Sequence, residues 1–111
     1  MESKSAVIAL SALAQDSRLA VYRLLVQAGP EGIVASEIAE RLGIPANTLS
    51  FHLKTLSHAD LVQSRQDGRF VTYSANYDQM NELLGFLTEN CCGDRGCAPL
   101  TVPLASRKRK T

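Results

Sequence analysis

The feature that most constrains this fold is a pair of short helical segments joined by a tight turn near the middle of the chain. The first segment runs from Ala35 to Leu42, and Gly43 follows it, where glycine commonly ends a helix. Pro45 opens the second segment, in the first turn, where a helix tolerates proline. Because only a few residues separate the two helices, the spacing predicts a helix-turn-helix.

The second of these helices is expected to have two different sides. Its buried stripe is predicted from three leucines at helical spacing: Leu49, Leu53 and Leu56. The opposite side is expected to be polar and to carry Asn47, Ser50, His52 and Lys54. The N-terminal residues of such a helix can contact base edges in a DNA major groove. An asparagine there can offer both a donor and an acceptor to adenine.

After Asp60 the pattern changes to two short strand-like runs, 61–65 and 69–74. Between them lies Gln66-Asp67-Gly68, and Asp-Gly is a strong hairpin signal. Arg65 and Arg69 stand beside this predicted turn, one at each side. A helix, a turn, a second helix and a hairpin with basic flanks together predict a winged helix-turn-helix. The fold class is therefore mainly α, with a small β-hairpin wing.

The candidate DNA contacts follow from this arrangement. The second helix supplies Ala46, Asn47, Thr48, Ser50, His52 and Lys54, and the wing supplies Arg65 and Arg69. The lysine and the two arginines are expected to contact the DNA backbone, and a wing arginine can also enter the minor groove. The formal net charge is only +1, so attraction to phosphates has to come from local positive charge.

Three further helices are expected to complete a domain over residues 1–90. A loose helical period covers 5–14, and a central helix begins with Asp16 as its N-cap and stops at Gly29-Pro30. The last helix runs from Tyr77 to Glu89, with an apolar face formed by Met80, Leu83, Leu84 and Leu87. Residues 91–111 form a cysteine-bearing C-terminal segment that ends in a flexible, solubilising basic tail, Arg107 to Lys110. With neither a secretory signal nor an apolar run of about 18 residues, we expect a cytoplasmic protein without a membrane partner.

All three cysteines lie close together, at Cys91, Cys92 and Cys97. An odd number argues against a disulfide scaffold. Gly93 and Gly96 permit the backbone reversal that would bring the third thiol back to the first two. Three thiolates suit a soft ion, and trivalent arsenic or antimony needs only three thiolate ligands. Zinc normally takes four ligands and would need another group or water.

Other roles for the cysteines stay open at this point. They could be exposed thiols without a ligand, or a redox switch in which Cys97 pairs with Cys91 or Cys92. A divalent soft metal such as cadmium is another candidate, with Asp94 as an oxygen ligand. An enzyme with a cysteine nucleophile is disfavoured, because no glycine-rich phosphate loop surrounds the thiols and both histidines lie in the DNA-contacting half. We therefore predict that the chain is not an enzyme.

The stretch from Ala9 to Leu87 resembles the ArsR/SmtB family of bacterial metal-sensing repressors, most densely in "TLSFHLKTL" and "RQDGRFVTYS". The resemblance implies a transcriptional repressor that binds operator DNA at an inverted repeat. It also implies a homodimer joined through the first and last helices. Phe51 stands where many members of the family carry a polar or basic residue.

The family resemblance also indicates which ion the protein would sense. Its original arsenic sensors carry cysteines at the start of the recognition helix, whereas the matching stretch "SEIAERLG" has none. Its zinc sensors use Asp and His on the last helix, and here Asp78 is present but no histidine follows His58. What remains resembles the arsenic-responsive members with a vicinal cysteine pair at the end of the last helix and a third cysteine nearby. The resemblance implies As(III), or Sb(III), as an inducer at Cys91, Cys92 and Cys97, with no cofactor in the DNA-bound form.

Overall fold

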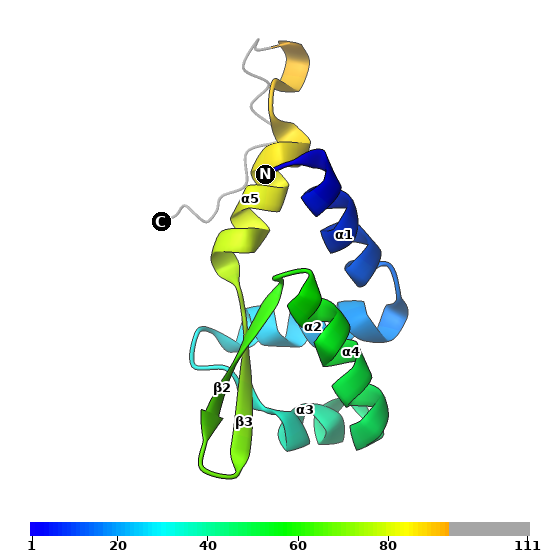
Figure 1. Cartoon of the computed structure of the whole chain (residues 1–111), viewed down its shortest axis with the longest axis vertical. Coiled ribbons are helices and arrows are strands. Elements are labelled where there is room, and N and C mark those ends of the chain that lie inside the picture. Colours follow the sequence, from blue (N-terminus) through cyan, green and yellow to red (C-terminus); the bar gives the residue numbers. More distant parts are fainter. Residues whose placement is uncertain (94–111) are drawn as a thin grey trace.

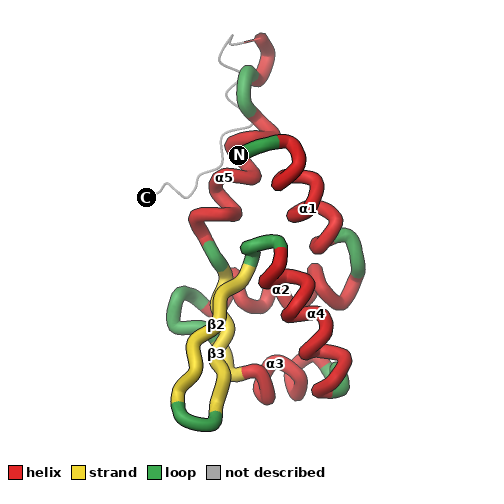
Figure 2. Tube along the Cα trace, viewed as in Figure 1, coloured by secondary structure: helices red, strands yellow, loops and turns green. Residues whose placement is uncertain are grey.

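The computed structural model describes residues 1–93, which form five α-helices and a three-stranded antiparallel sheet (Figure 1). In chain order the elements are α1 Ser3–Leu13, α2 Asp16–Ala28, β1 Ile33–Val34, α3 Ala35–Leu42, α4 Ala46–His58, β2 Val62–Asp67, β3 Phe70–Ala75, α5 Tyr77–Thr88 and a 3₁₀ turn, Cys91–Gly93. The predicted winged helix-turn-helix is confirmed. Figure 2 shows α2, α3 and α4 beside the hairpin, while α1 and α5 lie together at the other end of the molecule.

The inner face of α1 is made of alanine. Ala6, Ala9 and Ala12, spaced three apart, are at most 4% exposed, and their small side chains let the helix approach the core closely. The large apolar side chains of α1 point outward: Val7 is 57% exposed, Ile8 46% and Leu10 42%. The loose apolar period in the sequence therefore identifies the helix, but it does not identify the face that is buried within one subunit.

Helix α2 runs through the centre of the core, as predicted, with Val21 and Leu25 fully buried. The prediction of Asp16 as its N-cap is wrong by one residue. The cap is Gln15, whose side-chain oxygen accepts a hydrogen bond from the Arg18 backbone N–H at 2.9 Å. The longer glutamine side chain reaches back over the first turn, and Asp16 becomes the first helical residue.

Helix α3 has the predicted bounds, whereas α4 begins one residue after the predicted opening at Pro45. Gly43 adopts a left-handed conformation, with φ at 65°, and the Ile44 N–H donates to the Ala39 carbonyl at 3.1 Å. This bond satisfies a carbonyl at the C-terminus of α3 that the helix itself leaves free. Pro45 is the N-cap of α4, and Ala46 is its first residue.

The sheet has the strand order β1-β3-β2, and β1 is a two-residue strand that the sequence analysis did not predict. The hairpin was predicted, but the predicted position of its loop was wrong, and Arg65 pairs with Thr72 instead of lying opposite Arg69. Asp67 pairs with Phe70, so the loop consists of Gly68 and Arg69 rather than residues 66–68. Gly68, with φ at 64°, takes the first loop position, which places Arg69 in the turn itself.

The C-terminal helix joins the body through hydrogen bonds at its start. Asn76 caps α5 by accepting from the Gln79 N–H at 3.3 Å, and its side-chain amide donates to the Asp60 carbonyl at 2.9 Å. The Tyr77 hydroxyl donates to the Val26 carbonyl at 2.9 Å and so links α5 to α2. Across residues 1–93, no helix combines the length and apolar character that a membrane crossing requires.

Candidate nucleic-acid interface

Helix α4 presents one exposed, mostly polar face. Seven of its residues are exposed: Ala46, Asn47, Thr48, Ser50, Phe51, Lys54 and, at its C-terminus, His58. Since a helix turns once in 3.6 residues, positions 47, 50, 51 and 54 fall on one side. Leu49, Leu53 and Leu56 form the buried stripe that the sequence predicted, each at most 2% exposed. Helix α4 contains no acidic residue, so its own side chains do not repel a phosphate backbone.

His52 does not lie on this exposed face, and its predicted position there is wrong. Its side chain is only 7% exposed, and Nδ1 is buried without a hydrogen-bond partner among residues 1–93. The reason is helical geometry. Position 52 lies three residues after Leu49 and four before Leu56, which places it on the edge of the buried stripe. A buried imidazole is poorly placed to contact DNA directly.

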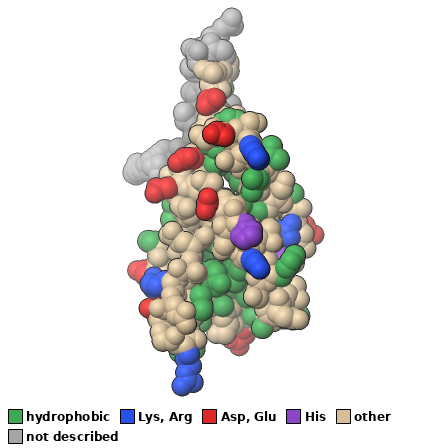
Figure 3. Space-filling view, viewed as in Figure 1, with side chains coloured by type: hydrophobic (Ala, Val, Ile, Leu, Met, Phe, Trp, Pro, Cys, Tyr) green, Lys and Arg blue, Asp and Glu red, His purple; other side chains and the backbone are tan. Residues whose placement is uncertain are grey.

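The two wing arginines differ in their surroundings. Arg65 Nε donates to Asp67 Oδ2 at 3.0 Å, and its Nη2 reaches the Glu31 carbonyl at 3.5 Å. Its charge is therefore partly balanced. Arg69 is exposed in the hairpin loop and forms no ion pair within the described part of the chain. Figure 3 shows a basic side chain projecting from the tip of the hairpin, where it could reach a groove beside the one that α4 enters.

Helix α5 and its end form the most acidic part of the described surface. Exposed carboxylates gather over α5 (Figure 3), where the helix and its end carry Asp78, Glu82 and Glu89. Lys54 and Arg69 lie on α4 and at the hairpin tip. Glu37 and Glu40 on α3 and Asp67 on the hairpin are exposed as well, so the positive charge is local to α4 and the hairpin loop.

Two exposed aromatic residues were not among the predicted contacts. Phe51 is 64% exposed on α4, and Phe70 is 56% exposed at the hairpin tip. The signal for Phe51 was present in the sequence, because it lies four residues after Asn47 and shares its face of the helix. The signal for Phe70 was absent, because its place depends on the hairpin register.

The first two cysteines lie on the turn directly after α5. Asn90 and Cys92 adopt left-handed conformations, with φ of 59° and 57°. This kink brings the Sγ atoms of Cys91 and Cys92 to 3.5 Å from each other. Two metal–thiolate bonds of about 2.3 Å can span that separation, so the pair fits one soft ion. Cys91 is a free, half-buried thiol and Cys92 is disulfide-bonded, so an ion site would need the reduced protein.

The third predicted ligand, Cys97, lies outside the described residues. Within residues 1–93, no three side chains of the His, Cys, Asp and Glu types form a group that could hold a metal ion. The cysteine turn and the hairpin tip lie at opposite ends of the molecule (Figure 1). Any signal from the cysteines must therefore travel through α5 and the body of the domain.

Comparison with known proteins agrees with this geometry. Residues 13–65 match a family model described as a helix-turn-helix domain. The chain is 39% identical over 77 residues to the uncharacterized HTH-type transcriptional regulator YceK of Bacillus subtilis (strain 168), covering 68% of this chain and 76% of that one. The structure of NolR from Sinorhizobium fredii is similar, with 32% identity, a TM-score of 0.63, and coverage of 78% of this chain and 84% of NolR. An ArsR-like transcriptional regulator from Rhodococcus sp. RHA1 gives 26% identity and a TM-score of 0.68, with 76% of each chain covered.

The fold and the exposed face of α4 define a DNA-binding protein of the winged helix-turn-helix class. Within that class, the chain belongs to the ArsR-like family of transcriptional regulators. The predicted family is confirmed at this level, and so is the prediction that the protein is not an enzyme.

Proposed function

We propose that the protein is a homodimeric repressor that leaves its operator when As(III), or Sb(III), binds Cys91, Cys92 and Cys97. The observation that carries the sensing half is the approach of the Cys91 and Cys92 sulfur atoms to 3.5 Å on the turn after α5; in the reduced protein both would be available as ligands. Sulfur ligands favour soft ions, and three thiolates complete the pyramid of trivalent arsenic. The domain of residues 1–90 would bind DNA and form the dimer, and segment 91–111 would sense the ion. As a regulator of transcription, it would act in the cytoplasm.

DNA binding would use the exposed face of α4 in the major groove. Asn47 and Ser50 would contact bases, and Lys54 would contact a phosphate. Arg69 would reach the DNA from the wing, in the backbone or the minor groove. Arg65 would contact DNA less strongly, because its ion pair with Asp67 already balances part of its charge. Thr48 and Ala46, exposed in the first turn, would lie against the duplex at the N-terminus of the helix.

Dimer formation would cover the apolar face that one subunit leaves open. On α1 this face carries Val7, Ile8 and Leu10, and on the adjacent α5 it carries Leu84 and Leu87, which are 38% and 53% exposed. Burial of such surface contributes about 25 cal/mol for each Å². A twofold axis at this face would relate two copies of α4. An operator that fits both copies must then be an inverted repeat.

Release would act at a distance. An ion at the three thiols ties the cysteine segment to the end of α5, which changes the angle between the two DNA-binding units of the dimer. The ion shifts the equilibrium only if it binds the low-affinity state more tightly. Coupling between such sites is typically about 1–3 kcal/mol, or roughly 5- to 150-fold in DNA affinity.

The direct experiment is a titration of the reduced protein with arsenite. A duplex recovered by selection from a random library is labelled, and anisotropy reports DNA binding while ultraviolet absorption reports arsenic–thiolate bonds. We expect the duplex to dissociate as the thiolate signal saturates. If the duplex stays bound while the ion is taken up, the release mechanism is wrong. If selection recovers no duplex, the DNA-binding half of the proposal is wrong.

A thiol redox sensor on the same fold is the second candidate, because Cys92 is disulfide-bonded in the structure. In that case oxidation, rather than ion binding, would release the DNA. Peroxide would dissociate the duplex, dithiothreitol would restore binding, and arsenic would not be taken up in stoichiometric amount.

Replacing Lys54 by glutamine should weaken binding to all DNA sequences about equally. Lys54 is exposed on the recognition helix, and the loss of one phosphate contact should lower the slope of log affinity against log salt by about 1. The measurement is anisotropy between 50 and about 200 mM KCl. Lys4→Gln, an exposed lysine on α1, is the matched control and should leave the slope unchanged. Equal salt-dependence slopes for the Lys54→Gln and Lys4→Gln variants would show that Lys54 does not contact a phosphate.

Phe51 should recognise the C5-methyl group of a thymine. It is 64% exposed at the centre of the face that would enter the groove, and an apolar side chain distinguishes thymine by this methyl group. Replacing the contacted thymine by deoxyuridine should weaken wild-type binding about fourfold, since one buried methyl-sized group contributes about 0.8 kcal/mol. Phe51→Ala should bind both duplexes equally, whereas Phe70→Ala should retain the preference. A preference that survives in Phe51→Ala would refute this assignment.

A further inference from the structure

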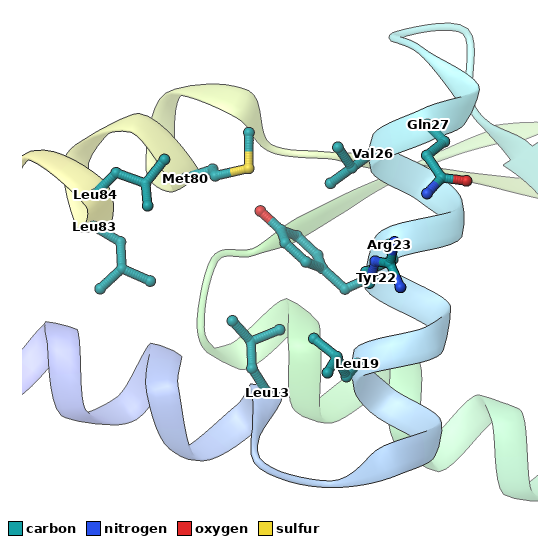
Figure 4. Close-up of a pocket in the computed structure, with 9 residues that line it drawn as sticks. All are labelled: Leu13, Leu19, Tyr22, Arg23, Val26, Gln27, Met80, Leu83 and Leu84. Carbon is teal, nitrogen blue, oxygen red and sulfur yellow. The ribbon is translucent and has the colours of Figure 1, made fainter. Parts of the chain in front are cut away.

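A cavity of about 280 Å³ lies between α2 and α5, beside the end of α1 (Figure 4). None of its lining residues belongs to α4, the hairpin or the cysteine turn, so it is separate from both sites described above. Its walls are mostly apolar and include Leu13, Leu19, Val26, Met80, Leu83 and Leu84. Sealed apolar cavities of about 150 Å³ accept benzene. A space of this size can hold an aromatic ring with a short substituent.

The one buried polar group aimed into this cavity is the hydroxyl of Tyr22. Figure 4 shows it pointing from α2 across the cavity towards α5. The side chain is 6% exposed, and its hydroxyl has no hydrogen-bond partner among residues 1–93. A buried hydroxyl without a partner is costly, and native proteins seldom retain one. The neighbouring Tyr77 hydroxyl, in contrast, donates to the Val26 carbonyl at 2.9 Å.

We propose that this cavity binds a small, uncharged and largely apolar molecule that carries one hydrogen-bond acceptor, such as the carbonyl of an aromatic ketone. The apolar walls would enclose the hydrocarbon part, and the Tyr22 hydroxyl would donate to the acceptor. Burial and the nearby Tyr77 raise the pKa of Tyr22 to about 12. The hydroxyl therefore keeps its proton at neutral pH and remains a donor.

A second copy of the chain is the competing occupant, because Leu19 and Leu84 are 44% and 38% exposed at the cavity and continue the apolar face of α1 and α5. An apolar side chain from a partner subunit would cover this opening but would leave the Tyr22 hydroxyl unpaired. A molecule with an acceptor would give the Tyr22 hydroxyl a hydrogen-bond partner.

Because α2 packs against α4, and α5 leads to the cysteine turn, an occupant would set the spacing of two helices that join the proposed DNA and ion sites. Only that regulatory consequence rests on the proposed function.

The test uses two probes of nearly equal size and shape, acetophenone and isopropylbenzene, added to the full-length reduced protein without DNA or arsenite. Methyl NMR signals of Met80 and Leu83 report occupancy. Both probes should shift these signals, and acetophenone should bind more tightly. Tyr22→Phe should weaken acetophenone about 2- to 12-fold, the range expected for one hydrogen bond, and should leave isopropylbenzene unchanged. Tyr73→Phe, a tyrosine of β3 outside the cavity, is the matched control.

Three results would overturn the proposal. The first is that neither probe shifts the Met80 or Leu83 signals at millimolar concentration. The second is that Tyr22→Phe changes the affinity of both probes equally. The third is that the probes bind only after Leu87→Glu has separated the dimer, which would show that the second copy fills the cavity. Because the assay contains no DNA and no arsenite, its failure would not bear on repression or ion sensing.

Discussion

With Cys91, Cys92 and Cys97 all changed to serine, the protein should bind its operator duplex equally tightly with and without arsenite. A serine hydroxyl stays protonated and is a hard oxygen, so it cannot replace a thiolate on a soft ion. The exposed face of α4 contains no cysteine, so the affinity of the ion-free variant should equal that of the reduced wild type. The wild type should lose roughly 5- to 150-fold in affinity upon adding arsenite. Anisotropy with the labelled duplex measures both quantities.

A single variant separates ion binding from the redox alternative. Cys91 is a free thiol, whereas Cys92 is disulfide-bonded, so Cys91→Ser removes one proposed ion ligand and leaves that disulfide intact. If the protein senses arsenite, this variant should respond much more weakly to arsenite. If it senses oxidation, Cys91→Ser should still release DNA with peroxide. Arsenite-driven release that survives the loss of all three cysteines would contradict the proposed site.

Replacing Gly32 by alanine should destabilise the domain by at least about 3 kcal/mol, which is large for a single substitution. Gly32 has φ at 80°, a conformation that costs a side-chain-bearing residue roughly 1–2 kcal/mol. An added Cβ would also fall on the carbonyl oxygen of Tyr73 and lie 3.0 Å from Thr72 Cγ2. Both residues belong to β3 at the point where β1 pairs with it, so the backbone would have to separate there.

Gly68→Ala is the matched control for this effect. Gly68 also has a positive φ, at 64°, but an added Cβ meets nothing within 4 Å. It should therefore show only the conformational cost, about 1–2 kcal/mol. Urea denaturation at a fixed protein concentration measures both variants, because the stability of a dimer depends on concentration. Equal losses of stability would mean that β1 yields to the added methyl group without breaking its pairing.

The sequence alone determined the helix-turn-helix, because its signals are local. The bounds of α3 and α4 depend on Gly43 and Pro45, whose effect acts through their own backbone conformations and not through distant contacts. The buried leucine stripe of α4 could also be predicted from the sequence, since three large side chains recur at the helical period. The hairpin was predicted from Asp67-Gly68, although its loop is formed by Gly68 and Arg69 rather than by residues 66–68.

Tertiary structure decided which of these side chains are available to a ligand. Helical spacing placed His52 between an exposed and a buried face, and packing against the core settled its burial. Packing likewise buried the alanines of α1 and left its larger residues for a partner. Strand β1, at two residues, is too short to give a periodic signal and exists only because β3 lies beside it. The Tyr22 cavity has no sequence signature at all, because it depends on how far α5 stands from α2.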